Sequence, residues 1–597
     1  MNSDRIKILV GLFVLGFLIL SGRLVYLQII KGDYYRKISE KNHIRIMVSN
    51  PPRGKIYDRN GILLAYDEPT FQLYTYPYLV KKDIPRLKQE LENLLGIKLE
   101  PETLEKLKKG YSNKLILEKR LSEEQVRTFI NNWHRFKGIF LEVQPRRVYT
   151  EYARYMPHLL GYVGYPSKKE LQENPDLTPD TLIGKSGVEK IYDRYLRGEH
   201  GVKAVMVDAK GRIVRTLWEK QPRRGNDIYL TVDARVQKIV YEAFSESGQK
   251  SGAVIVTDPY TYDIIALLSY PVYDIQKFSD GLTKKEWEEL IKNKYKPLFN
   301  KALYGIYPPG SIFKITVALA ALQEGVVAPY QRIYSGPEYS IGKWVYRNWD
   351  PRGCGKINVM QALEMSCDTY FYQVGIDLGA EKISYYARLF GLGEKLNPRI
   401  EKKTARIPDP EWKAHYIGEP WYLGDTVNYS IGQGFLAITP FDSVKILLPV
   451  LNGGRVLKPR LLKAYFDMNS RRFVETEVQQ VRKLHIKKFF YRIIKKGLYD
   501  VVYGERGTAK LLSLSPVKNA GKTGTAQVFR HKKRKEKIEK WYLQNHAWFV
   551  DFVPYRKPRY IISVFVEHGI GGSKTAVPIT KAIIEKLFDK GILNEVK

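Results

Sequence analysis

Residues 307–314 read Tyr307-Pro308-Pro309-Gly310-Ser311-Ile312-Phe313-Lys314, and this stretch decides how the rest of the chain is interpreted. A serine and a lysine three residues apart share one face of a helix, so the amine can lie beside the hydroxyl. The Pro-Pro-Gly sequence before Ser311 predicts that a helix begins there, with free amide donors and a dipole that favours negative charge. Because a desolvated lysine can take the proton of a serine, the pattern indicates a nucleophilic serine.

Two further motifs follow in the chain, Ser366-Cys367-Asp368 and Lys522-Thr523-Gly524-Thr525. Taken alone, Ser311 and Lys314 would be interpreted as a helix cap and a solvated side chain. The three motifs together resemble, in order and rough spacing, those of penicillin-binding proteins and class A β-lactamases. The trio therefore favours a serine acyl-transferase that acts on D-Ala-D-Ala or β-lactam amides.

Each residue of the first two motifs has an expected role. Ser311 would attack a carbonyl and carry the acyl group, while Lys314 would accept its proton. Ser366 could relay a proton to the leaving amine, and Asp368 could orient Lys314. The alternative for Ser366 is an ordinary helix cap before the next helix. An ionised Asp368 can only accept hydrogen bonds, unlike the Asn that is more usual there.

The third motif is predicted to form an edge strand. Such a strand could bind an extended peptide through backbone hydrogen bonds, with Lys522 holding a carboxylate. Gly524 would permit close approach, and Thr523 and Thr525 would line the site. The amide groups of Ser311 and Thr525 are candidates for an oxyanion hole. The alternative is a turn with a structural role only.

Composition limits the function classes. The 597 residues suggest two or three domains, and 98 Lys and Arg against 63 Asp and Glu give a formal charge of +35. The basic residues are spread along the chain without a zinc-finger, RNP or basic-zipper pattern, so we expect no nucleic-acid partner. Anionic lipid headgroups, pyrophosphate-linked substrates or a hot-environment composition explain the charge equally well.

The N-terminal region predicts a membrane anchor. Residues 8–30 are nearly all apolar, which matches the ~20 residues that cross a bilayer. No small-residue cleavage signature follows, so we expect an uncleaved signal anchor after a cytoplasmic tail of residues 1–7. A buried core helix is the alternative.

The two cysteines, Cys354 and Cys367, are too few for a disulfide-stapled scaffold. Buried thiols are favoured, while a disulfide or a metal site with Asp350 stays open. The nine histidines show no His-Glu-x-x-His spacing. We therefore expect neither a catalytic metal nor another cofactor.

The pattern along the chain predicts a multidomain α+β protein. Residues 31–226, with a helical head at about 80–140, would precede a new domain at 227–597. The resemblance to penicillin-binding proteins implies that these regions are a non-catalytic pedestal and a transpeptidase domain. Strand-like runs at 228–232, 253–258, 521–529, 547–552 and 560–566, with a closing helix at 578–588, predict a mostly antiparallel sheet flanked by helices. The basic run Arg530–Lys537 is expected to be a solvated loop, with contact to anionic wall or lipid as an alternative.

The chain resembles class B penicillin-binding proteins from the anchor nearly to the C-terminus. Arg53-Gly54 with Asp58-Arg59-Asn60-Gly61, and residues 184–189, resemble the pedestal signature of that class. Residues 366–372, 424–434 and 566–569 resemble its elongation-type branch, in which Asp is familiar in the second motif.

The resemblance implies D,D-transpeptidation, in which Ser311 is acylated by a stem peptide or by β-lactam antibiotics and an amine then takes the acyl group. It implies a RodA-type SEDS glycosyltransferase and an MreC-type activator as partners. It places the catalytic domain outside the cytoplasmic membrane, in the periplasm or extracellular space. The rival interpretations are a β-lactamase or D,D-carboxypeptidase, a non-enzymatic antibiotic sensor, and a basic nucleic-acid binder.

Overall fold

The computed structural model describes residues 3–34, 44–110, 114–207, 213–528 and 541–594. The chain forms two compact units that interleave along the sequence. The first unit comprises Met1–Arg53, Pro69–Pro145 and Arg197–Gly225, and the second comprises Gly54–Glu68, Arg146–Leu196 and Asn226–Lys597. The boundary of the pedestal therefore stays a prediction. The basic run Arg530–Lys537 lies outside the described residues.

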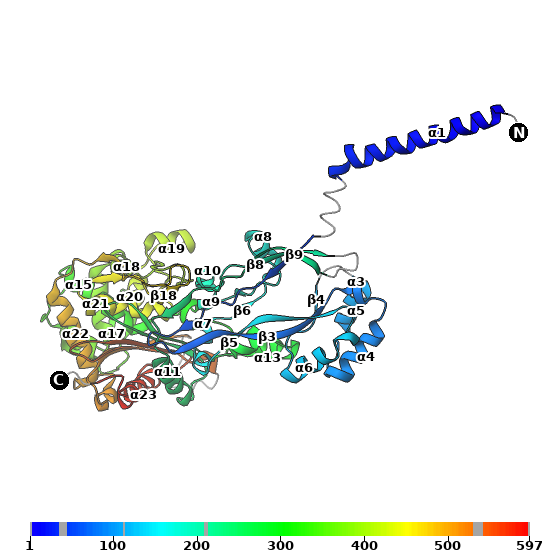
Figure 1. Cartoon of the computed structure of the whole chain (residues 1–597). Coiled ribbons are helices and arrows are strands. Elements are labelled where there is room, and N and C mark those ends of the chain that lie inside the picture. The colour runs from blue at the N-terminus through cyan, green and yellow to red at the C-terminus, as the bar shows by residue number, and fades with distance from the viewer. Residues whose placement is uncertain (1–2, 35–43, 111–113, 208–212, 529–540, 595–597) are drawn as a thin grey trace. The chain divides into compact units, whose positions relative to one another are not determined.

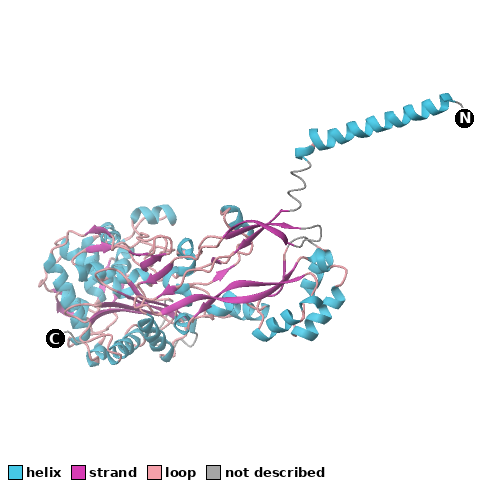
Figure 2. Cartoon of the chain, in the orientation of Figure 1, coloured by secondary structure: helices cyan, strands magenta, loops and turns pink. Residues whose placement is uncertain are grey.

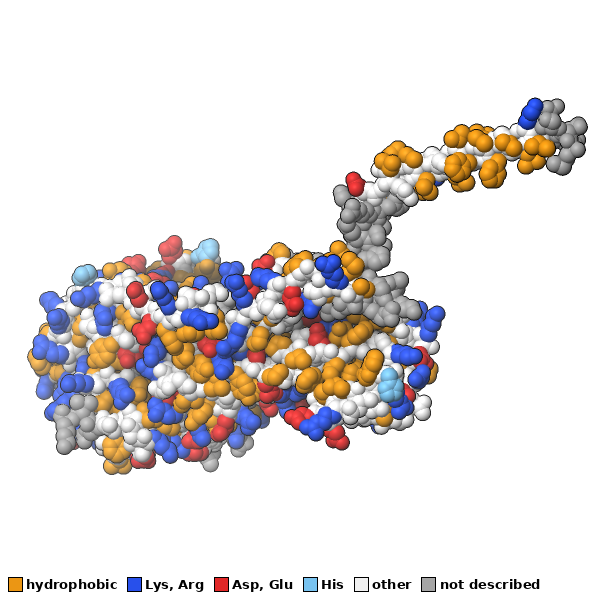
Figure 3. Space-filling model, in the orientation of Figure 1, with side chains coloured by type: hydrophobic (Ala, Val, Ile, Leu, Met, Phe, Trp, Pro, Cys, Tyr) orange, Lys and Arg blue, Asp and Glu red, His pale blue; other side chains and the backbone are white. Residues whose placement is uncertain are grey.

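The first helix is long and apolar. α1 (Ser3–Val25) continues into a π-helical turn, η1 (Tyr26–Ile30). Apolar side chains are exposed along its length, as the orange surface of this helix in Figure 3 shows. The 25 residues from Ile6 to Ile30 are long and apolar enough to cross a membrane.

The first unit also contains the predicted helical head. Its helices include α4 (Ile84–Leu95), α5 (Pro101–Lys109) and α6 (Glu123–Asn131), which bury Leu91, Leu107 and Phe129 in a shared core. The prediction of helices here is confirmed, although β4 (Leu115–Glu118) interrupts them by pairing with β3. A separate sheet has the order β1-β8-β9 and consists of Ile44–Ser49, Gly201–Val207 and Ile213–Lys220.

Two long strands contribute residues to both units, β3 (Leu63–Thr75) and β5 (Ile139–Tyr149). In the second unit β2 (Ile56–Tyr57) pairs antiparallel with β3. The same sheet continues through the strands β10 (Asp227–Leu230), β18 (Leu462–Asp467) and β19 (Arg472–Glu475).

A buried arginine ties this part of the second unit together. The side chain of Arg147 is fully buried, and its Nε donates to Glu189 Oε1 at 2.7 Å. Its Nη1 donates to Asp67 Oδ1 and to the carbonyl of Gly54, both at 2.9 Å. Because a buried charge needs partners of opposite sign, this cluster fixes the segments that it joins.

The central sheet of the second unit has five strands in the order β12-β11-β23-β22-β21. Every neighbouring pair is antiparallel, so the predicted fold class is confirmed. β21 occupies one edge, which leaves one side of this strand outside the ladder. The strands are β11 (Gly252–Thr257), β12 (Ile264–Tyr270), β21 (Ala520–Ala526), β22 (His546–Val553) and β23 (Tyr560–Val566).

Helices cover both faces of this sheet (Figure 2). On one face α11 (Ala234–Glu246) packs beside the C-terminal helix α23 (Ala576–Asp589), as Figure 1 shows. Alternate residues of β22 enter different cores, with Phe549 on the α11 and α23 side and Trp548 on the other. This alternation is what a sheet buried on both faces requires.

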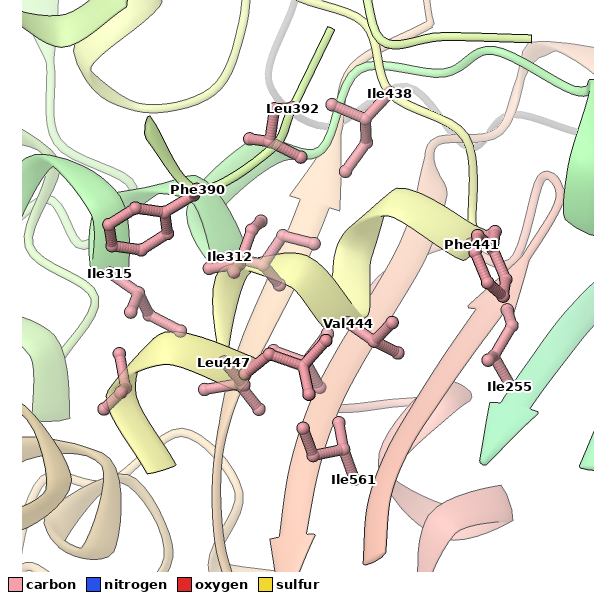
Figure 4. Close-up of a cluster of buried hydrophobic side chains, with 14 of the residues drawn as sticks. Ile255, Ile312, Ile315, Phe390, Leu392, Ile438, Phe441, Val444, Leu447 and Ile561 are labelled. Carbon is pink, nitrogen blue, oxygen red and sulfur yellow. The ribbon is translucent and has the colours of Figure 1, made fainter. Parts of the chain in front are cut away.

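The second face holds the helix that bears the first motif. α15 (Lys314–Gln323) is buried at every residue from Lys314 to Leu322, as expected for a helix that is apolar on all sides. Figure 4 shows Ile312 and Ile315 packed among Phe390, Val444 and Leu447. This packing gives the motif a rigid support.

Candidate active site

Ser311 lies at the beginning of helical structure, as predicted. The turn Gly310–Phe313 is a 3₁₀-helix, η4, and it leads directly into α15 at Lys314. In a 3₁₀ turn the side chains at positions i and i+3 eclipse each other, so Ser311 and Lys314 project on the same side. Ser311 is half-buried and Lys314 is fully buried.

Gly310 lets this turn approach two other segments closely. Its φ is +58°, and a Cβ on it would lie 2.6 Å from the carbonyl oxygen of Thr525. Gly310 N–H also donates to the carbonyl of Gly432 at 2.9 Å. The serine turn is therefore held between the edge strand β21 and the loop that contains Gly432.

Lys314 contacts the second motif directly. Its Nζ donates to Asp368 Oδ1 at 2.6 Å, to the carbonyl of Ser366 at 2.9 Å and to Ser366 Oγ at 3.4 Å. Burial lowers the pKa of Lys314 below its ordinary value, and the carboxylate of Asp368 opposes this effect. The amine is thus held in place and made easier to deprotonate.

Ser366 has an unusual backbone conformation. Its φ is 55°, in the left-handed region, and its side chain is almost completely buried. The next helix, α17 (Asp368–Leu378), has Cys367 as its N-cap, so the interpretation of Ser366 as the helix cap is wrong. Backbone strain of this kind is concentrated at functional sites.

The two cysteines form a disulfide, with Cα atoms 6.3 Å apart. The expectation of buried free thiols is therefore wrong, and both sulfurs are occupied by each other instead of by a metal. The bond joins the loop at Cys354 to the middle residue of the second motif, Cys367. The sequence could not show this pairing because it depends on how the loop folds back onto α17.

The third motif forms β21 and is not a turn, so the structural alternative for it is wrong. Lys522 is fully buried, and its Nζ donates to the carbonyl of Thr523 at 3.1 Å. Burial lowers the pKa of Lys522 well below its ordinary value, and the charge of Lys314 lowers it further. The hydroxyl of Thr523 lies 2.7 Å from that of Thr508.

Gly524 and Thr525 bring the edge strand against the serine turn. A Cβ on Gly524 would lie 2.9 Å from the carbonyl oxygen of Pro309, so only a residue without a side chain fits. The carbonyl of Thr525 accepts a hydrogen bond from Gln433 Nε2 at 3.2 Å. Backbone groups of the first and third motifs therefore lie side by side.

Four residues of this region were not identified as site residues from the sequence. Gln433 and Thr508 contact the third motif, and Asn348 and Trp349 contact Asp368. Gln433 stands in the stretch 424–434 that carried the family resemblance, which was a usable signal. Asn348, Trp349 and Thr508 belong to none of the three motifs, and their contacts depend on chain folding.

The geometry brings all three motifs together. The second motif surrounds the Lys314 ammonium, the third motif packs against η4, and Lys522 is close enough to Lys314 and Asp368 for their charges to act on it. A hydroxyl, two buried amines and a strand edge in one place can bind an extended peptide and transfer its acyl group.

Comparison with known proteins agrees with this geometry. The penicillin binding protein transpeptidase domain matches residues 252–585, and the penicillin-binding protein dimerisation domain matches residues 48–230. Peptidoglycan D,D-transpeptidase MrdA of Haemophilus influenzae is 33% identical over 617 residues, which cover 96% of this chain and 90% of the relative.

Two solved structures are similar over nearly the whole chain. In a complex between penicillin-binding protein (PBP2) and MreC from Helicobacter pylori, a chain superposes with a TM-score of 0.79 at 28% identity, covering 92% of this chain and 99% of that one. A chain of a peptidoglycan synthase complex that coordinates polymerization and crosslinking gives a TM-score of 0.72 at 28% identity, with 100% of both chains covered. The chain belongs to the class B penicillin-binding proteins and is a peptidoglycan D,D-transpeptidase of the PBP2 (MrdA) type, an enzyme of cell elongation and a target of β-lactams.

Proposed function

We propose that Ser311 is the nucleophile of the transpeptidase and that Lys314 is its general base. The observation that supports these roles best is the buried Lys314 ammonium, which is fixed by Ser366 and Asp368 within 3.4 Å. A lysine whose pKa is lowered by burial can exist as the neutral amine that accepts a proton.

The proposed reaction proceeds in two transfers. Ser311 Oγ attacks the carbonyl of the penultimate D-Ala while Lys314 takes the hydroxyl proton, and the amides of Ser311 and Thr525 stabilise the oxyanion. Ser366 passes a proton from Lys314 to the nitrogen of the terminal D-Ala, which leaves as the amide bond breaks. An amine of a second stem peptide then attacks the ester, gives up a proton and regenerates Ser311.

The third motif would bind the donor peptide. The free edge of β21 offers backbone groups of Thr523, Gly524 and Thr525 to an extended stem peptide. Lys522 would attract the terminal carboxylate of the peptide, or the carboxylate of a β-lactam. Asp368 would act by holding Lys314 and not by contacting the substrate.

Substitution of the buried lysine tests the proposed roles. Lys314→Met should reduce acylation by a fluorescent penicillin by at least about 10³-fold, because the base and the anchor of Ser366 are both lost. Lys301→Met is a matched control, because Lys301 is also buried, at 1% exposed, but donates to the carbonyl of Tyr295 outside the site. If both variants acylate at the same rate, Lys314 is not the base.

We further propose that residues 8–30 anchor the chain in the cytoplasmic membrane, with residues 1–7 inside and the catalytic domain outside. The exposed apolar surface of α1 supports an anchor. Protease digestion of intact spheroplasts should then remove the catalytic domain, and protection of this domain would contradict the orientation.

The assemblies in which the two similar structures were solved support proposals about partners. The Helicobacter pylori relative is solved with MreC, and another relative belongs to a peptidoglycan synthase complex. We expect this chain to bind a RodA-type SEDS glycosyltransferase and an MreC-type activator through the anchor and the pedestal of residues 31–226. Co-purification of the full-length chain with each partner tests this, and the absence of both partners from the purified chain would contradict it.

A further inference from the structure

A loop outside the three motifs holds the second motif in place. The backbone N–H of Asp368 donates to Asn348 Oδ1 at 2.8 Å, and the N–H of Trp349 donates to Asp368 Oδ2 at 3.2 Å. The other carboxylate oxygen, Oδ1, accepts the hydrogen bond of Lys314 at 2.6 Å. The loop therefore fixes both the backbone and the side chain of the residue that fixes Lys314.

Asn348 caps the N-terminus of α17 although it lies far from this helix in the sequence. The first N–H groups of an α-helix have no partner within the helix, and the N-cap of α17, Cys367, supplies no side-chain bond. Asn348 Oδ1 accepts the first of these N–H groups, that of Asp368. The helix N-terminus that carries the second motif is thus capped by a residue 20 positions earlier in the sequence.

The loop has its own fixed position, so it can serve as a support. Asn348 is 2% exposed, its N–H donates to the carbonyl of Pro337 at 2.8 Å, and its Nδ2 donates to the carbonyl of Asp350 at 3.1 Å. Trp349 Nε1 donates to the carbonyl of Met365 at 3.1 Å, and the Cys354–Cys367 disulfide closes the other end. An amide is the side chain that can accept from Asp368 and donate to a carbonyl at once.

We propose that Asn348 is a positioning residue of the transpeptidase, which acts through Asp368 to hold the Lys314 ammonium in the geometry for acylation. The inference rests on the proposed role of Lys314 as the base. Asn348 itself contacts no reacting atom in this account. Its effect is transmitted by its bond to the backbone N–H of Asp368 and, through the loop, by the bond from the Trp349 N–H to the carboxylate of Asp368.

The proposal predicts a change in the pH dependence of acylation. The charged groups that act on Lys314 or share its site are Asp368 on α17 and Lys522 on β21. Asp368 raises the pKa of Lys314 against the effect of burial. If Asp368 moves away, the pKa of Lys314 falls, so the acid limb of the acylation profile moves to lower pH while the maximal rate decreases.

Two substitutions and a matched control test the proposal in the full-length chain. Asn348→Ala should reduce the second-order rate constant for acylation by a fluorescent penicillin about 10-fold and move the acid limb to lower pH. Asn348→Asp keeps the acceptor for the Asp368 N–H but loses the donation to the carbonyl of Asp350, so it should recover part of the rate. Its added negative charge favours the protonated Lys314, so the acid limb should not move to lower pH. Rates are normalised to the amount of protein that can be acylated, so that a partly unfolded preparation is not mistaken for a slower rate of acylation.

The control is Asn452→Ala, because Asn452 Oδ1 also accepts a backbone N–H, that of Arg455 at 2.8 Å, and its Nδ2 donates to carbonyls outside the site. It should lower the melting temperature without changing the pH profile. If Asn348→Ala behaves in the same way, its role is structural and the proposal is overturned. Lys314→Met, measured in parallel, distinguishes failure of the proposed base from failure of the role of Asn348. If Lys314→Met is acylated at the normal rate, Lys314 is not the base and the inference about Asn348 is also wrong.

Discussion

Substitution of Gly310 by alanine should move the turn that contains Ser311 away from Thr525, whose amide is a proposed oxyanion donor. The added Cβ would lie 2.6 Å from Thr525 O and 3.0 Å from Thr525 C, in a backbone with φ of +58°. Because Cβ atoms in proteins do not approach other atoms within 3.0 Å, either the turn or β21 must shift by at least the difference, 0.4 Å. Both contacts are to backbone, so no flexible side chain can absorb the movement.

The expected effect on acylation is larger than the effect on stability. A left-handed alanine costs about 1–2 kcal/mol of folding free energy. The shift displaces Thr525, a proposed oxyanion donor, relative to Ser311, and loss of one oxyanion donor costs about 10²-fold in rate, or about 2.7 kcal/mol of activation free energy. Gly310→Ala should therefore reduce the acylation rate constant about 100-fold while the protein stays folded.

Gly325 provides the matched control. It follows α15, has φ of +73°, and a Cβ on it would meet nothing within 4 Å. Gly325→Ala should lower the free energy of unfolding by about 1 kcal/mol and leave acylation by a fluorescent penicillin unchanged. Equal acylation rates for the two variants would refute the claim that the close approach of Gly310 to Thr525 aligns the site.

Three further predictions concern charge and covalent structure. The rate of acylation should rise with pH through the pKa of Lys314, which burial places below its ordinary value. Asp368→Asn should move this rise to lower pH, because the carboxylate that raises the pKa of Lys314 is lost. A shift to higher pH in stopped-flow pH profiles would contradict this. Arg147→Met should lower the free energy of unfolding by about 3–5 kcal/mol, because it leaves buried carboxylates without their guanidinium, and adding Glu189→Gln should recover part of the loss in denaturant titrations. Reduction of the Cys354–Cys367 disulfide, which closes a loop with a sequence separation of 13, should lower the free energy of unfolding by about 3 kcal/mol, and an unchanged melting temperature in reductant would contradict its structural role.

Local patterns predicted much of the site. The spacing of Ser311 and Lys314 placed them on one side of a helical turn, and the apolar runs near residues 547–552 and 560–566 predicted two central strands. Both predictions depend on interactions between residues close in the sequence. The antiparallel pairing of these strands also follows from short connections, which is why the fold class could be stated from the sequence.

The remaining features depend on contacts between distant segments. The bonds from Asn348 and Trp349 to Asp368 use one amide side chain and one backbone N–H, and neither leaves a pattern in a single sequence. The disulfide could not be predicted for the same reason, because the spacing of two cysteines does not show whether the loop at Cys354 returns to α17. The helical head was predicted, but β4 within it is stabilised by pairing with β3, which periodicity does not reveal.

The central claim is that Ser311 is the residue that forms the acyl-enzyme. Incubation of the full-length chain with a penicillin, followed by proteolysis and mass spectrometry, identifies the side chain that carries the penicilloyl group. We predict one adduct, on the peptide that contains Ser311, and its loss in Ser311→Ala. An adduct on Ser366 or on any other residue, or one that persists in Ser311→Ala, would contradict the account.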